Sequence, residues 1–316
     1  MSSLTRSETA LWLSRRDQFT IVTHCRPDGD TLGSAAALCL GLRQLGKTAH
    51  VLENREVTAK YAPLLLGLTK PQVEPEDTVV CVDVGSAGRL QAEIRPLAET
   101  VQLRIDHHGS DAPFTAVDLV EPETAACGEI VYEVLRRMGV RLDKAMAEAL
   151  YTASSTDTGC FRFANTTAHT FLTAAACAEA GGDLATLNRV LFDTNTFRKL
   201  KIQSWITEHA RFLAEGQIAI CAIPLEVERA IGVTEDDMDG ISGFPKSIEG
   251  VKIAATLRQQ LDGSVKVSVR ALPGYDASQV CGHFGGGGHK GAAGCVIRMP
   301  LEEAAQALAE AMPEME

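Results

Sequence analysis

Residues 24–34, HCRPDGDTLGS, carry one histidine and two aspartates within seven positions, directly after the apolar run FTIV. The spacing between His24, Asp28 and Asp30 is four and then two residues. Carboxylates this close repel one another unless a cation lies between them. A capped turn is the simpler alternative, because an Asp such as Asp30 often begins a helix. The segment is therefore either a surface turn or half of a metal site.

Three further acidic or histidine-containing clusters occur in the same part of the chain: Asp83 in TVVCVDVG, Asp106-His107-His108 in VQLRIDHH, and Asp157 in STDTGCFRF. Ligands of open parallel sheets bind beyond the carboxyl ends of the strands, where three of the four clusters are expected. Taken singly, each is more simply a turn former, a helix cap or a core histidine. Together they would gather too much negative charge for the few nearby arginines (26, 89, 104 and 162) to balance.

The ligand types indicate which metal such a site would hold. Carboxylates dominate, imidazoles are the minority, and no thiolate is needed. This mixture favours Mn²⁺, with Mg²⁺ as the alternative, over structural zinc. A pair of such ions activates a water molecule and stabilises phosphoryl transfer.

A fifth cluster, Phe284 to His289 in FGGGGH, lies far along the chain. Consecutive glycines expose backbone N–H groups and admit an anion, although a flexible turn is an equally simple interpretation. Arg270, at the end of SVKVSVRAL, could offer phosphate a bidentate fork. Arg258, on the preceding strand, is more simply a solvated charge.

The elements that must position these residues alternate along the first half of the chain. Helical patterns at about 31–46, 56–67 and 88–98 separate short β-branched runs, an order that predicts an α/β fold with a mostly parallel sheet and helices on both faces. The predicted strands are 19–24, 48–53, 78–85, 101–108 and 114–121. Three helices are expected next, in CGEIVYEVLRRMG, DKAMAEALYTASSTD and TAHTFLTAAACAEAGG.

A second, smaller α/β region follows a connecting helix at about 196–214. QIAICAIP, VKIAATLRQQ and SVKVSVRAL are predicted strands, the last two joined by the Asp262-Gly263 turn. Residues 277–294 are expected to form a helix broken by glycines, followed by a strand (CVIRM) and a final helix (LEEAAQALAEAM).

Composition narrows the function classes. The 316 residues carry a net charge of −11, which argues against binding long duplex nucleic acid. No apolar run is long enough to span a membrane, and the N-terminus reads as an amphipathic helix, so we expect a cytoplasmic protein. The nine scattered cysteines are expected to be reduced and mostly buried.

The ordered motifs resemble those of the DHH phosphoesterase family. They are HCRPDGD (24–30), Asp83, Asp106-His107-His108 and TDTG (156–159), and FGGGGHKGAAG (284–294) resembles the glycine-rich motif of the DHH-associated domain. Length and layout resemble most the short oligoribonuclease and 3′-phosphoadenosine 5′-phosphate phosphatase branch. The resemblance implies a DHH catalytic domain at 1–195, a connecting segment at 196–213 and a DHH-associated substrate-binding domain at 214–316.

The resemblance also implies roles for individual residues. His24, Asp28 and Asp83 would bind one divalent cation, and Asp30, Asp83, His107 and Asp157 a second, with Asp83 bridging. Asp106 would support its neighbours, and His108 would face the substrate phosphate as a donor or acid. Arg270, His289 and the glycines 287 and 288 would bind substrate. VDVGS departs from the family after the bridging Asp, where relatives often have VDTSD, and Ala271-Leu272 stand where they often have Ser.

The expected function is therefore two-metal hydrolysis of very short oligoribonucleotides, or removal of the 3′-phosphate of 3′-phosphoadenosine 5′-phosphate. A cyclic di-AMP or pApA phosphodiesterase is the nearest alternative, followed by a family II-type pyrophosphatase and a nucleotide-binding module without catalysis. The expected partner is a short RNA or a bisphosphorylated nucleotide, held across a cleft between the two domains. A homodimer is compatible with the sequence.

Overall fold

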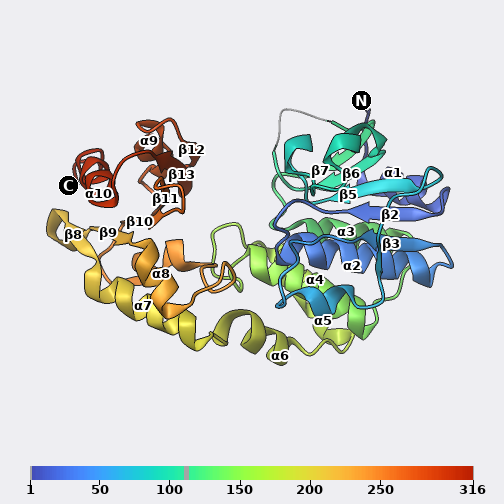
Figure 1. Ribbon diagram of the computed structural model, residues 1–316. Coiled ribbons are helices and arrows are strands. Elements are labelled where there is room, and N and C mark those ends of the chain that lie inside the picture. Colours follow the sequence, from blue (N-terminus) through green and yellow to red (C-terminus); the bar gives the residue numbers. More distant parts are fainter. Residues whose placement is uncertain (1, 110–113, 316) are drawn as a thin grey trace. The chain divides into compact units, whose positions relative to one another are not determined.

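The computed structural model describes residues 2–109 and 114–315, and the chain divides into two compact units, residues 1–194 and 195–316. Each unit contains one β-sheet with helices packed against it (Figure 1). The segment expected to connect the domains, 196–213, contains a helix and a strand that both belong to the second unit.

The first unit is built on a parallel sheet of seven strands in the order β1-β7-β6-β5-β2-β3-β4. The strands are β1 (Ser2–Ser3), β2 (Phe19–Val22), β3 (Ala49–Leu52), β4 (Thr69–Lys70), β5 (Thr78–Val82), β6 (Leu103–Asp106) and β7 (Val117–Val120). The predicted α/β class with a mostly parallel sheet is confirmed. The short edge strands β1 and β4 were not predicted.

The two faces of this sheet are covered differently. Ile21 and Val80 pack against the α-helices, whereas Val22 and Cys81 pack on the other face against Leu90 and its neighbours. The α-helices are α1 (Arg6–Ser14), α2 (Gly29–Gln44), α3 (Cys127–Arg137), α4 (Lys144–Asp157), α5 (Ala168–Glu179) and α6 (Leu184–Asn188), the last followed by a π-helical turn, η4 (Arg189–Asp193). The 3₁₀ helices η2 (Ala87–Arg89) and η3 (Arg95–Thr100) lie on the opposite face.

The helices predicted at 56–67 and 88–98 are wrong. The first region contains only the 3₁₀ helix η1 (Ala62–Leu65), and the second contains η2 and the start of η3. Pro63 and Pro96 each lie in the first turn of a 3₁₀ helix. Proline has no N–H and clashes with the preceding turn, so an α-helix does not run through either position.

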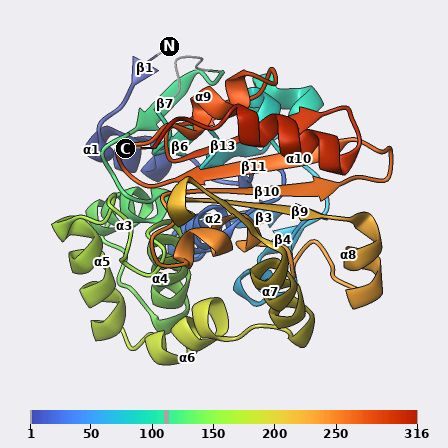
Figure 2. The same ribbon diagram turned by 90° about the vertical axis from the view of Figure 1, so that its left-hand side faces the viewer.

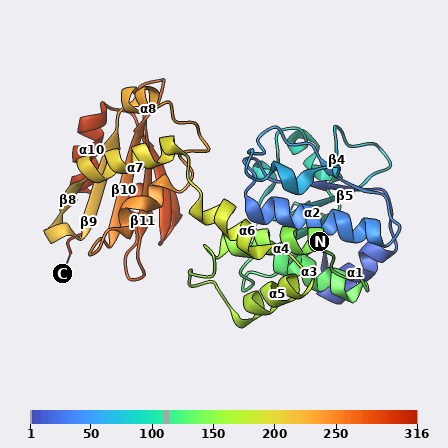
Figure 3. The ribbon, with the colours of Figure 1, turned by 90° about the horizontal axis from the view of Figure 1, so that it is seen from below.

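Close packing of α2 against α4 brings distant parts of the chain together (Figure 3). A Cβ on Gly33 would lie 2.3 Å from the carbonyl oxygen of Ala149, and one on Gly29 would lie 2.4 Å from Thr156 Oγ1. Only glycine permits this approach. The start of α2, with Asp30, therefore meets the end of α4, with Asp157.

The second unit contains a mixed sheet in the order β12-β13-β11-β10-β9-β8. Only the β9–β10 pair is parallel. The strands are β8 (Arg211–Leu213), β9 (Ile218–Ile223), β10 (Ile253–Gln259), β11 (Val265–Ala271), β12 (Gly287–His289) and β13 (Ala292–Ile297). The predicted β10–β11 hairpin turns at Asp262-Gly263, where Gly263 has a φ of +82°.

Helices cover both faces of this second sheet. Figure 2 shows α9 and α10 on one side of the strands and α7 on the other. The helices are α7 (Phe197–His209), α8 (Leu225–Ile231), α9 (Ala277–Gly282) and α10 (Leu301–Glu310), with 3₁₀ helices η5 (Ala214–Gly216) and η6 (Ile241–Ser247). No helix in the described ranges is long and apolar enough to cross a membrane.

The glycine-rich segment differs from the prediction. The expected broken helix over 277–294 is only α9, and residues 287–289 form the edge strand β12, paired with β13. Glycine disfavours both helix and strand. Pairing with β13 therefore decides the conformation.

Candidate metal centre

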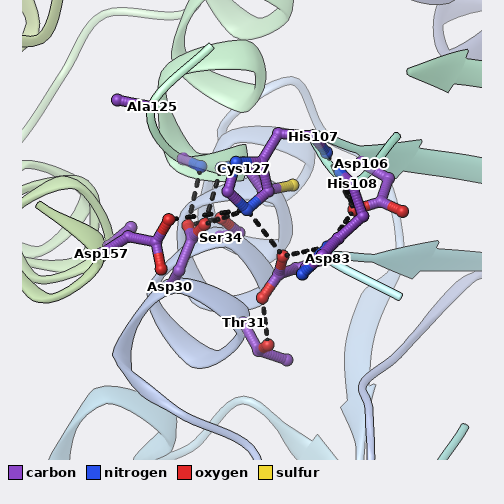
Figure 4. Close-up of polar contacts among 12 residues, drawn as sticks. Asp30, Thr31, Ser34, Asp83, Asp106, His107, His108, Ala125, Cys127 and Asp157 are labelled. Atoms are coloured by element: carbon purple, nitrogen blue, oxygen red, sulfur yellow. Dashed lines mark hydrogen bonds and ion pairs between the residues drawn. The ribbon is translucent and has the colours of Figure 1, made fainter. Parts of the chain in front are cut away.

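Three neighbouring strands of the first sheet, β2, β5 and β6, carry most of the predicted ligands. His24 lies two residues beyond β2, Asp83 directly follows β5, and Asp106 ends β6. Because the strands are parallel and adjacent, these side chains meet at one edge. Figure 4 shows Asp83 and Asp106 there. The sequence predicted this grouping.

The start of α2 orients the aspartates of the first cluster. Asp28 caps the helix and accepts hydrogen bonds of 3.1 Å from the backbone N–H groups of Asp30 and Thr31. Asp30 is buried and accepts from the N–H groups of Cys127 (2.7 Å) and Gly128 (2.9 Å) at the start of α3. Backbone donors and the positive end of the α3 dipole thus hold this carboxylate in place.

Asp83 lies between the clusters in a conformation that few non-glycine residues adopt, with φ of +57°. Its Oδ2 accepts a hydrogen bond of 2.5 Å from Thr31 Oγ1. Its Oδ1 is buried and has no hydrogen-bond partner among the described residues. His107 Nε2 lies 3.4 Å from Oδ1, and His24 Nε2 lies 3.6 Å from Oδ2.

The tautomers of two histidines follow from their backbone contacts. Nδ1 of His24 lies 2.7 Å from the carbonyl oxygen of Cys25, and Nδ1 of His107 lies 3.1 Å from that of Thr124. A carbonyl can only accept, so each Nδ1 carries the hydrogen. In its neutral form each ring would therefore direct an Nε2 lone pair toward carboxylate oxygens, an arrangement that requires a proton or a metal ion between them.

The geometry brings the predicted ligands into two groups. His24, Asp28 and Asp83 offer ligand atoms that lie within 4.8 Å of one another, and so do Asp30, His107 and Asp157. Asp157 joins the second group from the end of α4, with Oδ2 at 3.6 Å from His107 Nε2. Asp83 borders both groups through its two oxygens.

The pKa values reflect a cluster that lacks positive charge. Burial, together with the charges of Asp83 and Asp157, raises the pKa of Asp30 well above its usual range, and burial raises that of Asp157 to about 6. Burial would lower the pKa of His24 and His107, yet the adjoining carboxylates raise each to about 10. Protons on these groups supply charge that bound cations would replace.

Asp106 and His108 form a second layer beside these groups. Asp106 Oδ1 accepts from the N–H groups of His107 (2.8 Å) and His108 (3.1 Å) and from His108 Nδ1 at 2.9 Å. This hydrogen bond raises the pKa of His108. The His108 side chain is 48% exposed, so its Nε2 is available to a ligand.

These observations fit a pair of divalent cations. An orphaned buried carboxylate oxygen on Asp83, two imidazoles and three further carboxylates converge, and neither group of described residues contains a lysine or an arginine. The donor set is mostly oxygen, which suits Mn²⁺ or Mg²⁺.

The predicted substrate-binding residues belong to the second unit. Arg270 on β11 pairs with Ala292 on β13, which pairs with His289 on β12. Residues in one row of an antiparallel sheet project from the same face, so Arg270 and His289 share a face of this sheet. Arg270 makes no ion pair with any described residue, and burial lowers its pKa. Arg258, in contrast, is paired with Glu228 and Glu235.

The glycines of this region have different surroundings. A Cβ on Gly288, whose φ is +147°, would lie 2.6 Å from the carbonyl oxygen of Ala292. A Cβ on Gly287 would meet nothing within 4 Å. The fold therefore requires glycine at position 288, whereas position 287 has room for a larger side chain.

Several supporting residues were missed by the sequence analysis. Thr31 binds Asp83, Ser34 Oγ donates to Asp30 Oδ1 at 3.0 Å, and the Cys127 and Gly128 N–H groups hold Asp30. Ser34 lies one helical turn after Asp30, so its spacing was a usable signal. The α3 contact has no local signal because 97 residues separate Asp30 from Cys127.

Comparison with known families and proteins identifies relatives. The model of the DHH family N-terminal domain matches residues 18–154, and that of the DHHA1 domain matches residues 215–315. A protein of Thermus thermophilus named bifunctional oligoribonuclease and PAP phosphatase NrnA is 30% identical over 298 residues, covering 93% of this chain and 89% of the relative. A Bacillus subtilis protein of the same name is 24% identical, covering 92% and 93%.

Among solved structures, an exopolyphosphatase-related protein from Bacteroides fragilis has a TM-score of 0.86 and 23% identity. The match covers 97% of this chain and 94% of that one. This likeness supports the fold.

Proposed function

The chain belongs to the DHH family, and on that premise we propose that it is a metal-dependent phosphoesterase that hydrolyses very short oligoribonucleotides to nucleoside monophosphates. We propose that it also removes the 3′-phosphate of 3′-phosphoadenosine 5′-phosphate, abbreviated PAP in the names of its relatives. Two relatives that span most of the chain carry both activities in their names.

One structural observation carries this proposal: two groups of ligand atoms border the single carboxylate of Asp83 at the carboxyl edge of the parallel sheet. We propose that His24, Asp28 and Asp83 hold one cation and that Asp30, Asp83, His107 and Asp157 hold the other. When bound, a pair of Mn²⁺ or Mg²⁺ ions supplies an activated water and neutralises phosphoryl charge. Mn²⁺ is our preferred ion.

The side chains of the protein would perform the remaining tasks. Asp106 orients the His108 ring through Nδ1 and raises the pKa of the ring, which favours the form that also carries a proton on Nε2. We propose that this Nε2–H binds the substrate phosphate and donates its proton to the leaving oxygen. The N–H group of Cys127 holds the Asp30 carboxylate and Thr31 holds that of Asp83, so little reorganisation accompanies the reaction.

The second unit would bind the remainder of the substrate. An arginine without a carboxylate partner binds phosphate without first breaking an ion pair. We propose that Arg270 and His289, with the open backbone of Gly287 and the neighbouring Gly288, contact a phosphate of the nucleotide. The net charge of −11 agrees with local contacts to a short ligand.

A substrate panel tests the function. We expect Mn²⁺-dependent release of nucleoside monophosphate from two- to five-nucleotide RNAs and of inorganic phosphate from 3′-phosphoadenosine 5′-phosphate, both abolished by EDTA. Rates that are highest for pApA or cyclic di-AMP would instead favour the phosphodiesterase alternative. Hydrolysis of pyrophosphate alone, or binding without turnover, would contradict the proposal.

We also propose that the protein acts in the cytoplasm. All nine cysteines are unpaired, and seven are buried. Unpaired thiols are typical of reducing compartments.

A further inference from the structure

Arg104 is a buried cation beside the candidate metal centre that the functions above leave unassigned. It lies on β6, two residues before Asp106, and only 2% of it is exposed. A buried guanidinium is costly unless its donors are satisfied. Its partners therefore indicate what the fold uses it for.

One side of the guanidinium is fixed to β7. Nε and Nη2 donate to the two oxygens of Asp118 at 3.2 and 3.3 Å. Asp118 also accepts a hydrogen bond from Thr115 Oγ1. A bidentate fork with a supported carboxylate leaves the guanidinium little freedom to rotate.

The other side of Arg104 is directed at the loops of the candidate site. Nη1 lies 3.4 Å from the carbonyl oxygen of Gly85, two residues after Asp83, and 3.8 Å from Asp106 Oδ2. That oxygen is buried and has no hydrogen-bond partner among the described residues. Arg104 is therefore the guanidinium that the fold places against this oxygen.

The remaining oxygen of Asp106 connects this cation to the reaction. Oδ1 accepts from His108 Nδ1 and from the backbone of the turn that carries His107 and His108. Figure 4 shows Asp106 beside both histidines. A shift of the Asp106 carboxylate would move the His108 ring.

We propose that Arg104 is a positioning residue for catalysis: through Asp106 it fixes the orientation of the His108 ring. The side chain does not touch substrate or the candidate cations. This inference rests on the proposed phosphoesterase activity. It explains why a buried Asp118–Arg104–Asp106 series lies directly behind a half-exposed histidine.

The test is a double-mutant cycle on kcat and KM with a dinucleotide substrate. Arg104→Gln is expected to lower kcat about 10- to 100-fold, the usual cost of losing a supporting residue, with KM changed less than about threefold. In the His108→Ala background the same substitution is expected to lower kcat less than about threefold, because the ring it positions is gone. Arg104→Lys, which keeps the charge, should recover part of the loss.

A matched control separates positioning from general destabilisation. Lys70→Gln removes another part-buried ion pair of the first unit, with Asp77, and is expected to lower the thermal midpoint while leaving kcat unchanged. If Arg104→Gln does not fold, Asp118→Asn replaces it in the cycle. This variant keeps Arg104 and removes the charge of the carboxylate that holds its guanidinium.

The outcomes distinguish the two proposals. An equal fold-loss of kcat in the wild-type and His108→Ala backgrounds would overturn the role of Arg104, as would unchanged kcat in Arg104→Gln. A wild-type protein that releases no nucleoside monophosphate would overturn the proposed function instead.

Discussion

The two units carry opposite charges at the places where we propose that they bind a phosphate ester. The first concentrates carboxylates at a sheet edge. Most are buried, and several are oriented by hydrogen bonds, as Asp30 is by Cys127 and Gly128. The second offers Arg270, which is half-buried and forms no ion pair with the residues that the structure describes, beside an exposed glycine strand. The carboxylates of the first arrangement repel one another unless cations bind, whereas the second can bind an anion without a further ion. Changes in the first unit should therefore affect chemistry, and changes in the second should affect affinity.

The largest expected effect is that of Asp83→Ala. Loss of the carboxylate that borders both ligand groups should lower kcat by at least roughly a thousandfold. The metal-free protein should still fold but with a lower thermal midpoint, because the carboxylate loses its hydrogen bond from Thr31 and its contacts with His24 and His107, and an alanine at positive φ is strained. Kinetics at saturating Mn²⁺ and thermal unfolding measure the two effects.

Asp77→Asn is the matched control, since Asp77 precedes the strand that Asp83 follows. Asp77 accepts hydrogen bonds from Thr20 Oγ1 (2.6 Å), the Glu74 N–H group (2.7 Å) and Lys70. Its loss should reduce stability by roughly 1.5–3 kcal/mol with kcat retained. Full activity of Asp83→Ala would contradict the proposal that Asp83 is a ligand of the metal centre.

Comparison of the Mn²⁺-bound and metal-free protein should show stabilisation of the first unit alone. At a Mn²⁺ concentration one hundred times its Kd, binding stabilises the native state by about 2.7 kcal/mol per site. Hydrogen exchange should therefore slow in the first unit, at the start of α2 and the end of α4, and stay unchanged in the second. Equal slowing in both units would contradict the assignment of the ions to the first.

Arg270→Ala tests the other half of the comparison. Loss of a charge-assisted hydrogen bond of about 1.5–3 kcal/mol should raise KM roughly 10- to 150-fold, while the Mn²⁺-induced rise in thermal midpoint is retained. Arg258→Ala is the control on the neighbouring strand, because Glu228 and Glu235 already occupy its guanidinium. A KM for Arg270→Ala that matches the wild type would exclude Arg270 from substrate binding.

The smallest expected effect distinguishes two adjacent glycines. Gly287→Ala should leave stability unchanged, because its Cβ would meet no atom within 4 Å, and raise KM by about fivefold by hindering the ligand. Gly288→Ala should lower the thermal midpoint, because its Cβ would collide with Ala292 and Ala293. If Gly287→Ala leaves KM unchanged, the glycine strand serves the fold alone.

The features predicted correctly from the sequence are those that depend on short local patterns of residues. Alternating strands and helices indicated the parallel sheet, and the rule for strand ends placed His24, Asp83 and Asp106 at one edge. Family resemblance, now confirmed by the matches to both domain models, supplied the roles still to be tested.

Long-range packing accounts for what the sequence did not predict. The approach of Asp157 to Asp30 depends on Gly29 and Gly33 of α2 facing α4, and the strand at 287–289 exists only because β13 pairs with it. The sequence analysis identified Arg104 only as an arginine near the site. Its contacts were not predicted, since its partners on β7 and in the loop after β5 are not neighbours in sequence.

The left-handed backbone of Asp83 offers a practical route to a complex with intact ligand. Asparagine tolerates this conformation better than other non-glycine residues. Asp83→Asn should therefore preserve the bend of the chain and the shape of the side chain while removing its charge. A crystal of that variant, soaked with a dinucleotide, would be suited to trap the uncleaved substrate.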